Sequence, residues 1–192
     1  MTKAERDSVS SGLKVTTGLG SFTIELAASH APRTCSYFAD LATRGRLDDG
    51  AIFRITAVGN RPANVHHPIH VIQLGTRNGL NESRDRIVHE DTDASGLRHT
   101  RFTVSAARFE PGELYASFFV CLRDEPALDA GGGRRSDGKG YAAFGSIVDG
   151  RDVIESIYQR ADTSELLETP IAIERVDVVP LDAEPQKEET ST

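Results

Sequence analysis

Residues 14–26 read KVTTGLGSFTIEL, and residues 31–45 read APRTCSYFADLATRG. In the first segment Phe22, Ile24 and Leu26 alternate with polar residues after a Gly-Leu-Gly turn, a pattern that predicts a β-hairpin. In the second segment apolar residues recur at helical spacing after a proline suited to a first helical turn. The sequence therefore predicts a hairpin followed by one amphipathic helix.

Further segments rich in β-branched and aromatic residues follow, separated by polar, glycine-bearing loops. They are AIFRIT (51–56), HVIQLG (70–75), RFTVSAA (101–107), ASFFVCL (116–122), AAFGSIV (142–148) and PIAIERVDVV (170–179). In the last one the apolar residues change parity, which predicts a bulge near Arg175. The pattern RDVIESIYQ (151–159) predicts a second helix.

Many strands with only two helices do not make alternating βαβ units, which excludes a parallel doubly wound sheet. We therefore predict a mainly β fold, a closed eight-stranded antiparallel barrel capped by two α-helices, because closure removes exposed strand edges. The barrel domain should span residues 13–182. Residues 1–12 and the acidic residues 183–192 are polar and lack apolar anchors, so we expect disordered tails there.

The composition limits the classes of function. The 192 residues carry 22 Lys+Arg against 29 Asp+Glu, a net charge of −7, whereas a protein that neutralises nucleic-acid phosphates needs a basic face. No segment approaches the roughly 18 apolar residues of a membrane helix, and residues 1–12 have no apolar stretch for a signal peptide. We expect a cytoplasmic monomer with no nucleic-acid or membrane partner.

Two groups of residues suggest ligands but have simpler interpretations. His66, His67 and His70 have a spacing that can bind zinc or nickel, yet Pro68 interrupts them and a strand pattern follows. We favour solvated loop histidines and expect no metal, with a metal-dependent protein as a distant alternative. The only cysteines, Cys35 and Cys121, lie in a helical and a strand pattern and are too few for a disulfide framework, so we expect reduced, buried thiols.

Arg54 is an unexpected cation within the apolar strand pattern AIFRIT. Strict alternation would place Ile52 and Arg54 on one face and Phe53 on the other. For a lone arginine, the ordinary explanation is an ion pair at a barrel rim. Other segments, however, offer apolar groups and an amide that could lie beside it. These are Val71 and Gln73 in VIQLG, Ser117 and Phe119 in SFFV, Leu128 in PALD, and Tyr141 in GYAAFG.

The chain strongly resembles the cyclophilin-type peptidyl-prolyl cis-trans isomerases, particularly the bacterial kind. The resemblance rests on words that occur in the family's order from Leu13 to Val179: APRTCSYF, DGAIFRI, VIQLG, HTRFTVSAAR, ASFFVCL, PALD and GYAAFGSIVDGRDVI. It implies an eight-stranded barrel, agreeing with the strand patterns above. It also implies an enzyme without a cofactor that interconverts cis and trans X-Pro bonds in peptides and unfolded proteins.

The resemblance assigns roles to individual residues. Arg54 matches the family's catalytic arginine, and Gln73 matches the glutamine that ends its groove strand. The implied substrate-binding residues are Phe53, Val71, Gln73, Ala107, Phe109, Ser117, Phe119, Leu128 and Tyr141. Among these, Val71, Phe119 and Leu128 match the walls of the proline pocket, while Ala107, Arg108 and Phe109 match the segment that lies along the substrate backbone.

Three positions depart from the family pattern. The family's aromatic-x-Arg word is replaced by Ile52-Phe53-Arg54, which we interpret as a substitution, because a deletion would flip the following side chains across the sheet. Ser117 stands where many relatives have glutamine. Ala127 stands where cyclosporin-sensitive relatives have tryptophan, which implies that cyclosporin binds weakly. These departures leave an alternative, a cyclophilin-fold module that binds proline-containing segments but isomerises them poorly.

The proposed residues suit rotation about an X-Pro bond. The barrier of about 18–20 kcal/mol comes from the partial double bond of the imide. In the twisted state the prolyl nitrogen regains its lone pair and can accept a hydrogen bond. Arginine is a suitable donor because its planar guanidinium stays charged and is more weakly hydrated than an ammonium group.

Overall fold

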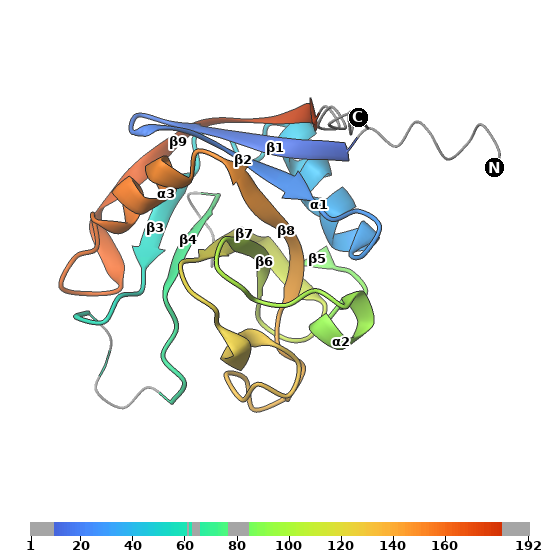
Figure 1. Cartoon of the computed structure of the whole chain (residues 1–192). Helices are drawn as coiled ribbons and strands as arrows, with labels where there is room; N and C mark the ends of the chain where they lie inside the picture. Colours follow the sequence, from blue (N-terminus) through green and yellow to red (C-terminus); the bar gives the residue numbers. More distant parts are fainter. Residues whose placement is uncertain (1–9, 61, 63–65, 77–84, 182–192) are drawn as a thin grey trace, which may run out of the picture.

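The alternating segments form strands that pair antiparallel around a closed barrel (Figure 1). The computed structural model describes residues 10–60, 62, 66–76 and 85–181. Within them the barrel strands are β1 (Ser10–Thr17), β2 (Gly20–Leu26), β3 (Ala51–Ile55), β4 (Val71–Gly75), β6 (Thr103–Arg108), β7 (Glu113–Cys121), β8 (Ala142–Asp149) and β9 (Leu166–Leu181). Their order is β4-β3-β9-β1-β2-β8-β6-β7, and pairing of β4 with β7 closes the barrel. The predicted fold is confirmed.

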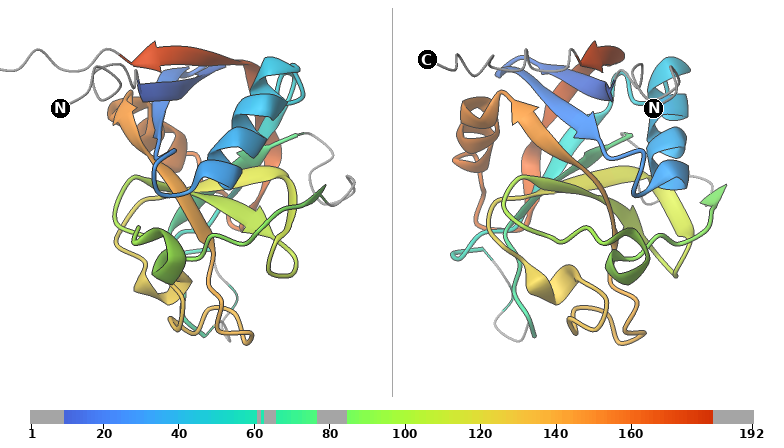
Figure 2. Two further views of the ribbon diagram at one scale, coloured as in Figure 1. Left: turned by 90° about the vertical axis from the view of Figure 1, so that its right-hand side faces the viewer. Right: turned by 45° about the vertical axis from the view of Figure 1, so that its right-hand side comes forward.

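A short strand, β5 (Asp85–Arg86), pairs with β7 outside the closed ring. The two predicted helices are α1 (Pro32–Thr43) and α3 (Arg151–Tyr158), which lie at opposite sides of the barrel (Figure 2). The described residues also form two short helical segments, α2 (Thr92–Ser95) and a 3₁₀ turn at Pro126–Leu128. In the part of the chain described, every helix is too short or too polar to span a bilayer.

The barrel interior is filled by the apolar residues that alternate along each strand, together with one face of each main helix. Phe38 of α1 stacks on Phe144 of β8 with ring centroids 4.5 Å apart and meets Phe118 of β7 edge-on at 5.3 Å. All three rings are at most 1% exposed. Cys35 and Cys121 are also buried, and both are free thiols as predicted. The helix thus closes one side of the barrel with aromatic packing.

The strand ends differ somewhat from the predicted ones. β9 pairs Arg175 with Thr16 but Ile173 with Thr17, so Glu174 is the extra residue, and the predicted bulge near Arg175 is confirmed. β9 begins at Leu166, before the predicted start at residue 170. β1 begins at Ser10, so residues 10–12, which we assigned to the N-terminal tail, pair with β9 instead. The rest of the two predicted tails lies outside the described residues.

Candidate active site

A bulge in β3 determines where Arg54 points. Ile52 pairs with Leu74 of β4, whereas Arg54 pairs with the preceding residue, Gln73, so that Phe53 is extra. Ile52 is fully buried in the barrel core with Leu74, while Arg54 shares the opposite face with Gln73. The expectation that Ile52 and Arg54 share a face is therefore wrong. Strict alternation would place a guanidinium in the apolar interior, and one extra residue avoids that cost.

A second apolar cluster covers the outer face of β4, β6 and β7, on the side opposite the core. We call it the outer-face cluster. Its members are Ile69, Val71, Ala107, Tyr115, Phe119, Cys121 and Leu128, with the partly buried Phe109 and Tyr141 packed against them. It contains six predicted substrate-binding residues: Val71, Ala107, Phe109, Phe119, Leu128 and Tyr141. Phe53, also predicted to bind substrate, is half-buried and belongs to neither cluster.

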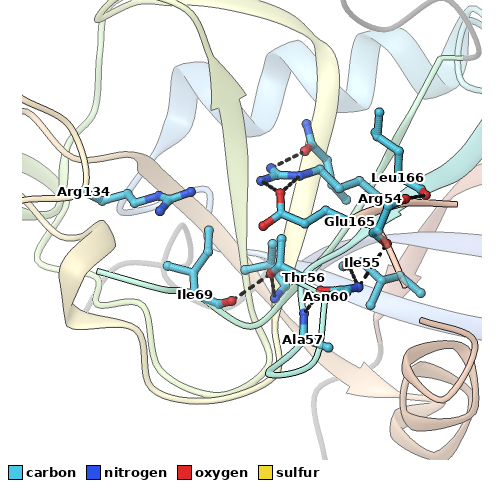
Figure 3. Close-up of polar contacts among 12 residues, drawn as sticks. Arg54, Ile55, Thr56, Ala57, Asn60, Ile69, Arg134, Glu165 and Leu166 are labelled. Carbon is cyan, nitrogen blue, oxygen red and sulfur yellow. Dashed lines mark hydrogen bonds and ion pairs between the residues drawn. The ribbon is translucent and has the colours of Figure 1, made fainter. Parts of the chain in front are cut away.

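The Arg54 guanidinium is fixed by two partners (Figure 3). Its Nε and Nη2 donate to the same carboxylate oxygen, Oε2 of Glu165, at 3.1 and 2.6 Å. Its Nη1 donates to Oε1 of Gln73 at 3.2 Å. Figure 3 also shows the side chain of Arg134 pointing toward the ion pair of Arg54 and Glu165. The cation therefore lies beside the outer-face cluster in a defined orientation.

The Gln73 amide is oriented in turn by two hydroxyl groups. Its Nε2 donates to the Tyr115 hydroxyl at 3.1 Å and to Oγ of Ser117 at 3.3 Å, so its oxygen faces Arg54. Burial raises the pKa of the Tyr115 phenol, which therefore stays neutral at physiological pH. Ser117 is fully buried and donates to the Leu74 carbonyl at 2.9 Å. We predicted Ser117 as a substrate contact, but in this structure it positions Gln73.

His99 links the cluster to the 3₁₀ turn. Its Nδ1 lies 2.7 Å from Oδ1 of Asp129, its Nε2 lies 2.9 Å from Oγ of Ser105, and its ring stacks against Phe119 at 6.2 Å. Burial alone would raise the pKa of Asp129, but the hydrogen bonds from His99 outweigh it and lower that pKa. The atom order is that of a serine-hydrolase triad. Ser105 is fully buried, however, so the triad cannot reach a substrate carbonyl and supports Phe119 instead.

A cation beside an apolar surface, with an ordered amide next to it, is the arrangement that the resemblance implied. Comparison with protein families gives an independent result. Residues 12–178 match the family model of the cyclophilin-type peptidyl-prolyl cis-trans isomerases. The chain belongs to the cyclophilin family. Peptidyl-prolyl cis-trans isomerisation is the activity named for this family and for its curated relatives, so the predicted activity is confirmed.

Individual relatives support the assignment. The chain is 33% identical over 143 residues to peptidyl-prolyl cis-trans isomerase-like 1 of Emericella nidulans, covering 72% of this chain and 76% of that protein. It is 30% identical to a peptidyl-prolyl cis-trans isomerase of Streptomyces antibioticus, covering 77% of this chain and 82% of that protein. The crystal structure of a Cryptosporidium parvum cyclophilin has a TM-score of 0.70 at 19% identity, covering 90% of this chain and 99% of that one.

In this cyclophilin Arg108 ties β6 to the loop before β8. Its side chain is fully buried and donates from both terminal nitrogens to the Asp137 carboxylate at 2.8 and 2.9 Å, and from Nε to the Gly140 carbonyl at 2.7 Å. Its guanidinium also lies 5.2 Å from the Tyr141 ring centroid. The resemblance placed Arg108 along the substrate backbone, but in this structure its guanidinium is hydrogen-bonded to Asp137 and Gly140 of the loop.

The Arg108–Asp137 pair should make stability depend on pH. The hydrogen bonds from Arg108 lower the pKa of Asp137 from 3.8 to about 2. A lowered folded-state pKa contributes stability above the unfolded pKa that is lost as pH falls through the folded pKa. We expect wild type to be more stable than Asp137→Asn at about pH 5, with the difference shrinking by about pH 2. Thermal unfolding of both proteins between these pH values measures it, and a constant difference would contradict it.

The histidine group is arranged differently from our expectation. His66 and His67 are exposed, but His70 is buried, and both its Nδ1 and its backbone N–H contact Oε1 of Glu125, at 2.9 and 2.7 Å. The expectation of three solvated loop histidines is therefore wrong for His70. This residue directly precedes β4, and because it is buried its polar atoms need hydrogen-bond partners within the protein. Among the residues the structure describes, no cluster of His, Cys, Asp or Glu could hold a metal ion.

Sequence reasoning missed two polar residues of this site. Glu165 lies in the loop between α3 and β9, more than 100 residues from Arg54, and nothing in its local sequence distinguishes it from the other acidic residues of the chain. Tyr115 did carry a signal, because it shares the parity of Ser117 and Phe119 in β7. Extending the alternation by one more pair would have placed it on the site's face.

Proposed function

We propose that this cyclophilin catalyses rotation about X-Pro bonds in peptides and unfolded proteins by donating hydrogen bonds from Arg54 to the twisted imide. The observation that carries the proposal is the guanidinium of Arg54, ordered by Glu165 and Gln73 at the edge of the outer-face cluster. The cluster supplies apolar side chains for the pyrrolidine ring, with Val71, Phe119 and Leu128 as its walls.

Arg54 retains donors for a substrate. A guanidinium has five N–H groups, of which Glu165 and Gln73 take three. Among the described residues no other partner takes the remaining two, one on each terminal nitrogen. These can donate to the prolyl nitrogen, whose lone pair is available only when the imide is twisted. The bond is therefore stronger in the transition state than in the planar ground state, which is the requirement for catalysis.

The energies are of the right size. A thousandfold acceleration requires about 4 kcal/mol of preferential transition-state binding. A hydrogen bond from a charged donor contributes about 1.5–3 kcal/mol. The rest can come from the apolar surroundings, which favour the less polarised twisted imide over the planar one. Rotation breaks no covalent bond, so proton transfer is not part of the reaction.

Several narrower features belong to the same proposal. The Streptomyces match supports a cyclophilin of the bacterial kind. The C. parvum protein was also crystallised in the presence of the dipeptide Ala-Pro, which supports proline-containing peptides as substrates here. Weak cyclosporin binding follows from Ala127. We propose a cytoplasmic monomer without nucleic-acid or membrane partners, supported by the net charge of −7 and by the thiols of Cys35 and Cys121, which stay reduced in that compartment.

The alternative function is a binding module that holds proline segments without isomerising them. Its support is that Arg54 is already paired with a carboxylate, which reduces its positive field, and that Ser117 replaces a longer side chain. Exchange spectroscopy by NMR on a proline tetrapeptide distinguishes the two. The enzyme should raise the cis–trans exchange rate well above that in buffer. Saturable peptide binding with exchange no faster than in buffer would instead identify the binding module.

A further inference from the structure

The loop before β9 is held firmly against β3. The Ile55 N–H donates to the Glu165 carbonyl at 2.8 Å, which continues the pairing of β3 with β9. The Asn60 side chain donates to the carbonyls of Ile55, Asp162 and Ser164 at 2.9–3.1 Å, and its own oxygen accepts from the Ala57 N–H at 2.8 Å (Figure 3). The backbone of Glu165 is therefore fixed relative to the strand that carries Arg54.

The carboxylate of Glu165 contacts one edge of the guanidinium. Its Oε2 accepts from both Nε and Nη2, and the two side chains are only 26% and 20% exposed. Because Nε and Nη2 define one edge of the planar group, this contact fixes the rotation of the guanidinium about its last side-chain bonds. Gln73 contacts Nη1 from another direction. Between them, the two partners leave a single orientation for the unused N–H groups.

We propose that Glu165 is a positioning residue for the isomerase reaction, which holds Arg54 in the orientation that donates to the twisted imide. The inference rests on the proposed function of Arg54. Glu165 has no substrate contact in this scheme and acts only through the guanidinium. An arginine side chain has many rotamers, so an unheld Arg54 would have to lose that freedom in each transition state. Pairing with Glu165 removes that freedom before the substrate binds.

Glu165 also has an electrostatic effect. Its negative charge stabilises a guanidinium that stands partly desolvated beside the apolar cluster, but it weakens the field that Arg54 presents to the substrate. Holding the guanidinium in place should raise the isomerisation rate, whereas weakening its positive field should lower it. We expect orientation to dominate, because the hydrogen bond to the imide nitrogen depends steeply on angle, whereas the field of a partly exposed pair is weakened by water.

Kinetics of three variants test this proposal. Glu165→Ala should lower kcat about 10-fold or more while KM changes less than about twofold, the size expected for one lost charge-assisted hydrogen bond. Glu165→Gln keeps an oxygen that can accept from Nε and Nη2, although neutral acceptors bind more weakly, so it should recover part of the rate. The matched control is Glu168→Ala, which removes an exposed glutamate three residues further on, in β9, and should match wild type.

An NMR readout separates positioning from a structural role. The Nε–H signal of Arg54, assigned by its loss in Arg54→Lys, should exchange with water about 10-fold faster or more in Glu165→Ala than in wild type, because it loses its acceptor. Backbone amide signals should stay unchanged apart from those of residues 162–168 and of the directly bonded residues Arg54, Ile55 and Gln73. A Glu165→Ala variant that keeps the wild-type kcat, or in which only KM changes, would overturn the proposal, as would unchanged Nε–H exchange in that variant.

The same data keep the two proposals apart. If wild type shows no exchange above buffer, the proposed function fails whatever Glu165 does. If wild type is active and Arg54→Lys is impaired but Glu165→Ala is not, the function stands and the positioning role of Glu165 fails. A fall in activity that follows a general loss of folded protein, seen in the backbone amide spectrum, would also count against positioning.

Discussion

Replacing Arg54 by alanine should reduce kcat/KM for a proline tetrapeptide about 10- to 150-fold, the equivalent of one charge-assisted hydrogen bond of about 1.5–3 kcal/mol. The guanidinium lies beside the outer-face cluster and is the group whose free N–H donors can reach a twisted imide there. The measurement is the cis–trans exchange rate by NMR or a protease-coupled assay. Removing the arginine leaves the apolar cluster in place, so peptide binding should persist while the rate falls.

Two further variants make this result specific. Arg54→Lys keeps the charge but replaces a planar fork of donors with a single ammonium point, so we expect it to lose most of the rate as well. Arg44→Ala removes an exposed arginine that pairs with Asp40 on α1, and it should leave kcat/KM unchanged. Equal rates for wild type and Arg54→Ala, with both proteins folded, would refute the catalytic role of Arg54.

The barrel could be predicted because its strands carry strong local signals. Residues 14–26 contain their own turn and alternation, and each later strand has a run of apolar or β-branched residues between glycine-bearing loops. Closure followed from the count of strands and helices. Strand ends were harder to place, since Ser10 and Leu166 pair with neighbouring strands through their backbones, and their residue types give no signal of that pairing.

The apolar side of the site could be predicted and its polar side only partly. Parity along β4 and β7 correctly grouped Val71, Gln73 and Phe119 on one face. Parity failed in β3, where the bulge at Phe53 turns Arg54 away from the core, because a bulge responds to the cost of burying a charge within the assembled barrel. Glu165 was not predictable at all, since its role depends on a loop folding back against β3.

The second large effect concerns the aromatic packing of α1 against the barrel. Phe38→Ala should lower the free energy of unfolding by about 3–5 kcal/mol, a large share of the roughly 5–15 kcal/mol that holds a domain folded. Phe38 is fully buried, and it loses a stacked partner, Phe144, and an edge-on partner, Phe118, at the same time. Urea unfolding followed by circular dichroism measures the change.

Phe38→Leu is the matched variant. Leucine retains most of the buried apolar area and leaves a smaller cavity, so Phe38→Leu should lower the free energy of unfolding clearly less than Phe38→Ala does.

The Phe38→Ala variant also tests how far the core and the site are coupled. β7 places Phe118 in the barrel core and Phe119 in the outer-face cluster, and its backbone is paired on both sides by β4 and β6. A cavity beside Phe118 should therefore leave the strand and the Phe119 ring in place. The folded fraction of Phe38→Ala should accordingly isomerise peptides within about twofold of wild type, a change of less than about 0.5 kcal/mol in the barrier. A much larger loss of rate would mean that the outer-face cluster depends on core packing more than the paired backbone of β7 implies.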